Sequence, residues 1–321
     1  MRTVLVVDGP HEAATDLIVQ ALTDRAVPAF RMDTAQFPAE VELSAHHRGG
    51  PAAGPWEGRL TTACRSVDLA DIGAVYWNRP QQFEFPGLSV ADEHWARGAA
   101  RIGLGGVLTG LPVPWMNHPS RAAAAEFKPE QLRVAAAAGL DTLPTLVTNS
   151  AEEVRRFAKE VGAPLITKPL GIPYIAHTGQ VETMYTRRVD LDELDGIETS
   201  AHLFQEEVQD KAYEVRVIVI GGACHGVRID AGSTAAGLDW RTDYDALTYS
   251  SVAVPCSVAA AIRTYMKWMG LTYAAHDFVV RTDGRWTFYE ANPSGQFAWL
   301  NEKVEFPLAD TIADTLKGWC T

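Results

Sequence analysis

Residues 274–292 read AAHDFVVRTDGRWTFYEAN, with an apolar run on each side of Asp283-Gly284. An Asp-Gly pair between two β-branched and aromatic runs predicts a β-hairpin with a two-residue loop. In that hairpin Asp277 lies opposite Glu290, with Cβ atoms about 5 Å apart on one face. The stretch therefore predicts two antiparallel strands that hold a pair of carboxylates.

Two carboxylates placed directly opposite each other repel unless a cation lies between them. Asn292, two residues beyond Glu290, points to the same face and adds a third oxygen ligand. Oxygen-only ligands suit a hard cation, Mg²⁺ or Mn²⁺. The alternative is a solvated acidic face, but the neighbours Phe278 and Phe288 are of buried type. The prediction requires that no one-residue bulge shifts the register.

Composition limits the class of protein. The chain has 321 residues, 47% hydrophobic and 21% charged, which excludes disordered and collagen-like chains. This length indicates two domains or three small ones. The 28 basic and 40 acidic residues give a net charge of −12, so no nucleic acid is expected as a partner. One local pocket can still be basic.

No apolar stretch approaches the roughly 18 residues of a membrane span, so no membrane is expected as a partner. The opening MRTVLVVD resembles a signal peptide only briefly, because Asp8 and Glu12 interrupt it and no cleavage site follows. It is more typical of a buried first strand. The four cysteines are too scattered for a metal site or a disulfide scaffold. We expect reduced thiols and a cytoplasmic location.

The first part of the chain, residues 1–117, has the pattern of a parallel sheet. A strand is predicted over 3–7, a helix over 13–22 and a second strand near 28–32. This β-α-β order is typical of parallel pairing. The part contains neither a G-x-G-x-x-G nor a G-x-x-x-x-G-K-[ST] motif, so dinucleotide-binding and P-loop folds have no support.

The second part, residues 118–201, alternates helices and strands. One helix is predicted from Pro129 to Gly139, and another from the capping box at Ser150 to Gly162. A short strand over 164–169 carries Lys168, and residues 170–180 predict a mobile loop.

The third part, residues 202–321, is predicted to contain several strands and a helix. Strands are expected over 203–208, 214–220 and 224–230, with a helix over 258–269 that ends at Gly270. The hairpin 274–292 belongs to this part. The sequence has no internal repeat.

The run YEANPSG, residues 289–295, resembles the C-terminal metal motif of ATP-grasp ligases. Other pieces match in the family's order: Lys128, Lys168, FQEEV at 204–208, EVR at 214–216 and DWR at 239–241. Within this superfamily the chain is most similar to the graspetide maturases, the microviridin-type enzymes that form side-chain esters or amides in ribosomal peptides. The supporting motifs are YWNRP at 76–80, KPEQL at 128–132 and NPSGQF at 292–297.

The resemblance implies an α/β chain with the ATP-grasp fold. It implies a parallel-sheet pre-ATP-grasp domain over 1–117, a central lid subdomain over 118–201 and a C-terminal subdomain with the metal site over 202–321. The last two are α+β subdomains that clamp ATP.

The resemblance also implies a role for each site residue. Asp277, Glu290 and Asn292 would hold Mg²⁺, or Mn²⁺. Residues implied in ATP binding are Lys128, Lys168, Glu206, Glu207, Val208 and Glu214. Arg216 and Arg241 would stabilise the transferred phosphoryl group as catalytic residues, and Arg228 would bind the acidic substrate. The alternatives are solvated lysines, exposed glutamates and, for Arg228, a surface ion pair.

The implied activity is that of an ATP-dependent macrocyclase. Asp or Glu side chains of a precursor peptide become acyl phosphates, which Thr or Ser hydroxyls capture as esters or Lys amines capture as amides. The expected partner is a peptide with a leader and a core rich in acids and hydroxyls, and a homodimer is expected. One alternative is an ATP-grasp ligase that adds free amino acids to a peptide or small acid. Another is a non-catalytic ATP-binding regulator.

Overall fold

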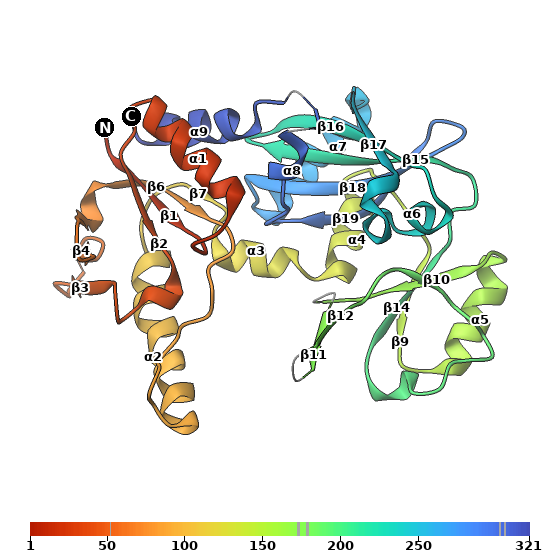
Figure 1. The fold of residues 1–321 in the computed structure, drawn as a ribbon, viewed down its shortest axis with the longest axis horizontal. Helices are drawn as coiled ribbons and strands as arrows, with labels where there is room; N and C mark the ends of the chain where they lie inside the picture. Colours follow the sequence, from red (N-terminus) through yellow and green to blue (C-terminus); the bar gives the residue numbers. More distant parts are fainter. Residues whose placement is uncertain (52, 172–173, 178–179, 302, 305) are drawn as a thin grey trace. The chain divides into compact units, whose positions relative to one another are not determined.

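The computed structural model describes residues 1–51, 53–171, 174–177, 180–301, 303–304 and 306–321 (Figure 1). The chain forms two compact units. Unit 1 comprises Met1–Ala122, Leu271–Tyr273 and Ser294–Thr321, and unit 2 comprises Ala123–Gly270 and Ala274–Pro293. The predicted three-part division of the chain stays a prediction.

Unit 1 is built on a parallel sheet of order β2-β1-β6-β7. Its strands are β1 (Thr3–Val7), β2 (Ala29–Met32), β6 (Ile72–Trp77) and β7 (Trp115–Met116). All pairings are parallel. Residues 4–7 are fully buried, as expected for a strand covered on both faces. The predicted β-α-β opening is thus confirmed.

Helices cover this sheet. They are α1 (Ala13–Asp24), α2 (Val90–Thr109) and α9 (Leu308–Trp319). α1 packs beside α9, and these two helices contact β2 and β6. α2 places Leu104 and Leu108 in one core cluster with Leu5 and Met32 of the sheet. The backbone amide of Arg2 donates to Cys320, so the two ends of the chain lie side by side.

A small antiparallel sheet of β3 (Glu42–His46), β4 (Glu57–Thr61) and β5 (Ser66–Asp68) completes unit 1. The remaining helices are α3 (Pro119–Ala125), at the boundary of the units, and α8 (Ala298–Asn301). In the described part of the chain, no helix is both long enough and apolar enough to cross a membrane.

Unit 2 contains a six-stranded sheet of order β17-β16-β15-β18-β19-β8. Its strands are β8 (Asp141–Thr142), β15 (Lys211–Ile220), β16 (Ala223–Ala231), β17 (Leu247–Val252), β18 (Tyr273–Arg281) and β19 (Trp286–Asn292). The accompanying helices are α4 (Lys128–Ala137), α6 (Thr234–Leu238) and α7 (Cys256–Met269). Tyr265 of α7 packs against Phe288, so α7 covers one face of the central hairpin.

A second sheet of unit 2 has the order β13-β10-β14-β9. It consists of β9 (Thr145–Thr148), β10 (Leu165–Lys168), β13 (Arg187–Arg188) and β14 (His202–Glu206). The helix α5 (Ala151–Val161) packs on it through Val154, in one cluster with Leu165. As predicted, the Ser150 hydroxyl caps α5 and Gly162 ends it in a left-handed conformation.

The predicted mobile loop over residues 170–180 is wrong in part. The strands β11 (Tyr174–His177) and β12 (Gln180–Thr183) form an antiparallel hairpin there. Residues 172–173 and 178–179 lie outside the described residues. In the sequence, Gly171, Pro173 and Gly179, which favoured a loop, lie outside the two four-residue runs 174–177 and 180–183.

The central hairpin confirms the predicted pairing of Asp277 with Glu290, although its loop differs from the prediction. The Arg281 amide donates to the Arg285 carbonyl at 2.9 Å, so the loop has three residues, and Gly284 takes the left-handed conformation at φ 86°. A three-residue loop with glycine at this position is a common hairpin connection. The two-residue loop was therefore the wrong prediction.

A β-bulge between Asp277 and Phe278 restores the register. Phe278 pairs with Phe288 and Asp277 with Glu290, so Tyr289 is the extra residue. The longer loop and the bulge each shift the pairing by one residue, in opposite directions. The carboxylates thus face each other because two deviations from a regular hairpin compensate.

Gln131 fixes α4 to the bulged strand. Its side-chain amide donates to the carbonyls of Ala125 (2.6 Å) and Ala291 (2.8 Å), and its carbonyl accepts from the Ala291 amide (3.0 Å). It therefore pairs with backbone groups of β19 beyond the end of β8. Lys128, one turn earlier on α4, is held beside Glu290 in this way.

We predict that Gln131→Leu lowers the free energy of unfolding by about 3 kcal/mol, because two buried backbone groups of Ala291 lose their partner. Arg133→Leu on the same helix is the control. Arg133 is exposed and pairs only with Glu130 there, so its loss changes stability by about 0.5 kcal/mol or less. Urea unfolding checks both values. Equal stability of the two variants would contradict the assigned role of Gln131.

Candidate active site

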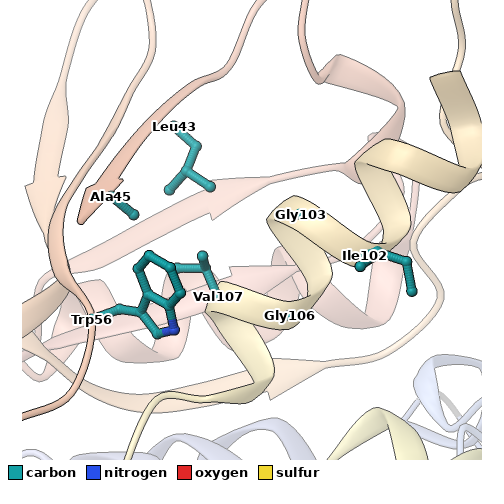
Figure 2. Close-up of a pocket in the computed structure, with 7 residues that line it drawn as sticks. All are labelled: Leu43, Ala45, Trp56, Ile102, Gly103, Gly106 and Val107. Carbon is teal, nitrogen blue, oxygen red and sulfur yellow. The ribbon is translucent and has the colours of Figure 1, made fainter. Parts of the chain in front are cut away.

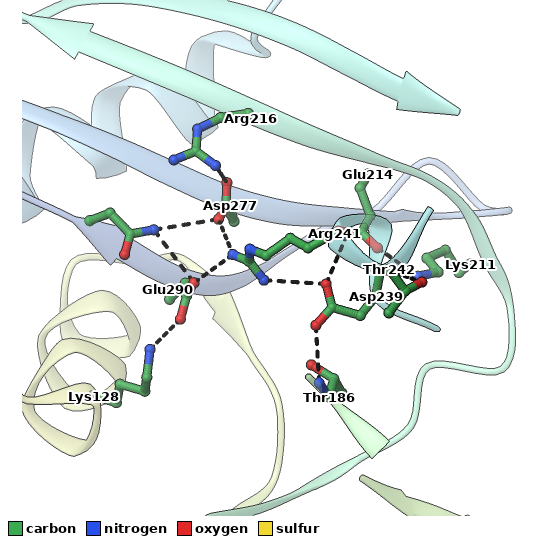
Figure 3. A network of polar contacts seen from close by, with 11 residues as sticks. Lys128, Thr186, Lys211, Glu214, Arg216, Asp239, Arg241, Thr242, Asp277 and Glu290 are labelled. Carbon is green, nitrogen blue, oxygen red and sulfur yellow. Dashed lines mark hydrogen bonds and ion pairs between the residues drawn. The ribbon is translucent and has the colours of Figure 1, made fainter. Parts of the chain in front are cut away.

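Asp277 and Glu290 lie at the centre of a cluster of buried charges (Figure 3). Lys128 Nζ donates to Glu290. Arg241 Nη2 donates to Glu290 at 3.1 Å and to Asp277 at 3.4 Å. Arg216 Nη1 lies 3.5 Å from Asp277 Oδ1. Each carboxylate thus has two cationic partners.

The elements of unit 2 bring these side chains together from distant parts of the sequence. Lys128 begins α4, Arg216 lies on β15, and Arg241 lies in the 3-10 turn η4 (Trp240–Thr242). The Trp240 ring lies near both guanidinium groups, with its centroid 5.0 Å from Arg241 Cζ and 5.8 Å from Arg216 Cζ. An aromatic face at this distance stabilises a cation that is partly removed from water.

The surroundings shift the pKa values of the two carboxyl groups in opposite directions. Burial alone would raise the pKa of Glu290, but Lys128, Lys168 and Arg241 together hold it well below its usual range. Burial raises the pKa of Asp277, and Arg216 and Arg241 offset this effect only in part. The carboxylates also raise the pKa of Arg241 against the effect of burial. The cluster keeps Glu290 ionised at neutral pH.

The donor set fits a hard divalent cation. Asp277 Oδ1 is buried and accepts no hydrogen bond, so it has lone pairs free toward a ligand. Asn292 Nδ2 lies 3.5 Å from Asp277 and 3.4 Å from Glu290, and rotation of its amide would present the oxygen instead. Across the described residues, no three His, Cys, Asp or Glu side chains converge as a metal site. The candidate centre has two carboxylates and an amide.

Lys168 reaches the same cluster from β10. Its Nζ lies 5.4 Å from the centroid of the Tyr289 ring, the extra residue of the bulge. Burial lowers the pKa of Lys168 to about 8, partly offset by Glu290. Lys128, Lys168, Arg216 and Arg241 outnumber the carboxylates that they surround. The site is therefore locally basic in an acidic chain and suits a polyanion.

An apolar cluster lies beside the cations. Leu143, Val208 and Val279 are buried together, and the half-buried Tyr289 packs on them. Val208 was predicted to bind ATP, and it lies in this buried apolar cluster; its role in ATP binding stays a prediction.

The two glutamates before Val208 have other partners. Glu207 accepts two hydrogen bonds from the exposed Arg188, at 2.7 and 2.8 Å, and this arginine lowers the pKa of Glu207 despite partial burial. Glu206 lies 3.9 Å from Arg281. The side chain of Glu207 therefore links β13 to the segment after β14, and its role in ATP binding stays a prediction.

Glu214, one of the residues predicted to bind ATP, is buried on β15. Burial raises the pKa of its carboxyl, and Lys211, whose Nζ donates to it at 2.7 Å, opposes this shift. Arg228, the predicted substrate residue, is bound to Asp230 at 2.6 and 2.7 Å and stacks on Tyr213. It is the surface ion pair that was the alternative, and its substrate role stays a prediction.

Sequence reasoning missed four residues that position these groups: Gln131, Arg188, Lys211 and Asp239. Gln131 and Asp239 lie inside the motifs KPEQL and DWR but were given no role, and Lys211 lies three residues before Glu214 on the same strand. His276, next to Asp277, is buried among aromatic rings, and burial lowers its pKa to about 3. It is uncharged at neutral pH and packs as a core residue.

Unit 1 has an apolar cavity of about 480 Å³ between α2 and β3 (Figure 2). Its lining residues are Leu43, Ala45, Trp56, Ile102, Gly103, Gly106 and Val107. None of these side chains carries a charge or a nucleophile, so the cavity offers no groups for catalysis.

Comparison with known proteins identifies the architecture. The profile of the MvdD pre-ATP grasp domain family matches residues 3–96, and no curated protein matches the chain. The macrocyclase MdnC from Microcystis aeruginosa MRC, bound with the precursor peptide MdnA, is similar with a TM-score of 0.85 and 27% identity. The match covers 98% of this chain and 99% of that chain.

Two further structures share the fold. A Chryseobacterium gregarium RiPP-associated ATP-grasp ligase, in complex with ADP and a leader and core peptide, matches with a TM-score of 0.89 and 24% identity over 99% of this chain and 97% of that chain. PsnB, an ATP-grasp ligase complexed with a phosphomimetic variant of its minimal precursor, Mg and ADP, matches with a TM-score of 0.76 and 25% identity. This match covers 99% of this chain and 98% of that chain. The α/β ATP-grasp fold and the resemblance predicted from the sequence are confirmed.

We predict that Lys168→Met raises the free energy of unfolding at pH 7 by roughly 1–3 kcal/mol. The folded pKa of about 8 lies below the unfolded value, so the buried charge destabilises the folded state below pH 8. Between pH 8 and about 10.4 the unfolded chain binds more protons, and the wild type gains stability as the pH rises.

Urea unfolding at pH 7 and pH 10 measures this effect, with the exposed Lys159→Met as the control. Glu290 retains Lys128 and Arg241 as partners in the variant. A stability difference that is independent of pH would contradict the prediction.

Proposed function

We propose that this chain, whose residues 3–96 match the MvdD pre-ATP grasp domain family, is an ATP-dependent macrocyclase of a ribosomal precursor peptide. The observation that carries this proposal is the cluster of cations around the buried carboxylates of Asp277 and Glu290, beside an apolar cluster. A polyphosphate with an attached base fits such a combination. The similar enzyme MdnC holds a precursor peptide in its structure.

In this proposal Lys128 and Lys168 bind the phosphates of ATP, and Glu214 accepts hydrogen bonds from the ribose hydroxyls. The base packs on Val208 and its apolar neighbours. Phosphoryl transfer needs positioning and charge neutralisation more than a protein nucleophile. This agrees with a site in which burial leaves His276 uncharged and packed in the core.

The reaction proceeds in two steps. A carboxylate oxygen of an Asp or Glu side chain of the peptide attacks the γ-phosphorus, and ADP leaves, which gives an acyl phosphate. A hydroxyl or amine of the same peptide then attacks the carbonyl carbon, loses its proton and expels phosphate. Arg216 and Arg241 stabilise the negative charge in both steps. Mg²⁺ bound by Asp277, Glu290 and Asn292 would neutralise phosphate charge.

The first prediction is the mass of the product. The protein, ATP, Mg²⁺ and a precursor peptide encoded beside its gene should yield a peptide lighter by one water molecule per bond. A tethered nucleophile has a high effective concentration, which favours ring closure over attack by a free amine. Tandem mass spectrometry should place each bond between an Asp or Glu and a Thr, Ser or Lys side chain.

A heavier product that contains an added amino acid would instead establish a ligase of free amino acids. ATP binding without ADP release in the presence of the peptide would indicate a non-catalytic regulator. Both outcomes contradict the macrocyclase.

The proposed metal ligands can be tested by substitution. Glu290→Gln and Asn292→Ala should each lower ADP release by a factor of about 100 or more, because each removes a metal ligand. The exposed Glu152→Gln and Asn149→Ala serve as controls for the same changes in chemistry. Turnover is normalised to the folded fraction measured by circular dichroism. Near wild-type turnover in both site variants would overturn the metal assignment.

A further inference from the structure

Asp239 joins the candidate site to the connection between β12 and β13 (Figure 3). Its Oδ1 accepts hydrogen bonds from the Arg241 backbone amide at 3.1 Å and from Arg241 Nη1 at 3.4 Å. Its Oδ2 accepts from the Thr186 backbone amide at 3.0 Å. The carboxylate is buried, and all three donors approach it at the same time. None of the roles assigned above uses this residue.

Thr186 belongs to the part of unit 2 that carries Lys168. It directly precedes β13, whose Arg187 and Arg188 pair with Thr167 and Ile166 of β10. A shift of β10 and β13 as a unit therefore moves the Thr186 amide. Asp239 itself precedes η4 and lies beside the six-stranded sheet through Arg241. One carboxylate thus bridges the two sheets of unit 2.

Asp239 is one of three carboxylates that accept hydrogen bonds from the Arg241 guanidinium. The guanidinium divides its hydrogen bonds between Asp239 on one side and the pair Asp277 and Glu290 on the other. Under the proposed function, the latter two are ligands of a metal ion and share their electron pairs with it. Asp239 remains as the carboxylate that holds the arginine in place.

Resting on the proposed function, we infer that Asp239 is a positioning residue that sets Arg241 only when residues 184–188 are in place. The hydrogen bond to Thr186 fixes the carboxylate, and the carboxylate fixes the guanidinium. Arg241 is then held toward the acyl phosphate only while the contact between Thr186 and Asp239 is intact. When the contact is broken, the arginine is free to turn away and water attacks the acyl phosphate, which returns carboxylate and phosphate.

Hydrogen exchange of the free protein tests the contact without any substrate. Asp239→Asn replaces one acceptor oxygen with an amide, so exchange in the peptide that spans residues 184–188 should rise several-fold. Asp245→Asn, which makes the same change at an exposed position after η4, should leave this exchange unchanged. Equal protection in Asp239→Asn and wild type would overturn the inference.

Turnover tests the consequence for Arg241. Asp239→Asn should lower kcat roughly 10-fold and raise the ratio of ADP released to water lost from the peptide. The affinity for ATP should stay within about twofold, because Lys128 and Lys168 are intact. A merely structural loss would lower both products together and leave their ratio at the wild-type value, which would contradict the positioning role.

Substitutions at Thr186 provide a matched pair. Thr186→Pro removes the backbone donor and should reproduce the raised ratio, whereas Thr186→Ala keeps the donor and should behave as wild type. Because both changes break one contact, Asp239→Asn and Thr186→Pro combined should be no worse than the stronger single variant. Additive effects would overturn the inference. If the wild type joins no side chains in the peptide, the proposed function fails, and the exchange experiment still decides the contact.

Discussion

Two carboxylates buried side by side, Asp277 and Glu290, are the constraint on which the rest of unit 2 depends. An isolated buried carboxylate costs several kcal/mol, so each must have a cation within hydrogen-bonding or ion-pair distance. The fold supplies these cations from separate elements: Lys128 from α4, Lys168 from β10, Arg216 from β15 and Arg241 from η4. The attraction of these cations to the two carboxylates brings four segments of unit 2 together around one hairpin.

Local sequence patterns predict much of this arrangement. The Asp-Gly pair and the alternation around it lead to the right partners, Asp277 and Glu290, because the apolar face of the hairpin has to remain buried. They do not lead to the right loop. A three-residue loop and a bulge preserve the inward face as well as a two-residue loop does, and the bulge also turns Tyr289 toward Lys168. Periodicity alone cannot distinguish the two solutions.

Residues with distant partners could not be predicted. Gln131 satisfies the backbone of Ala291, Glu207 binds Arg188, and Asp239 binds the Thr186 amide. In each case the partner lies on another element of the fold. Where the partner is a backbone group, its residue type gives no indication of the contact. Arg228 is a different case, because the sequence left both a substrate ligand and a surface ion pair open for it. Its partner is Asp230, two residues away.

The charge cluster also constrains the order in which a ligand can be accepted. Lys128 and Arg241 already hold Glu290, so a cation that takes its oxygens leaves a partly buried ammonium and a partly buried guanidinium without that partner. A polyphosphate removes this cost, since it offers both groups a new anionic partner. Under the proposed function, nucleotide and metal are therefore accepted together rather than in sequence. Asp239 keeps one partner for Arg241 throughout that exchange, which is why its contact with Thr186 bears on the fate of the acyl phosphate.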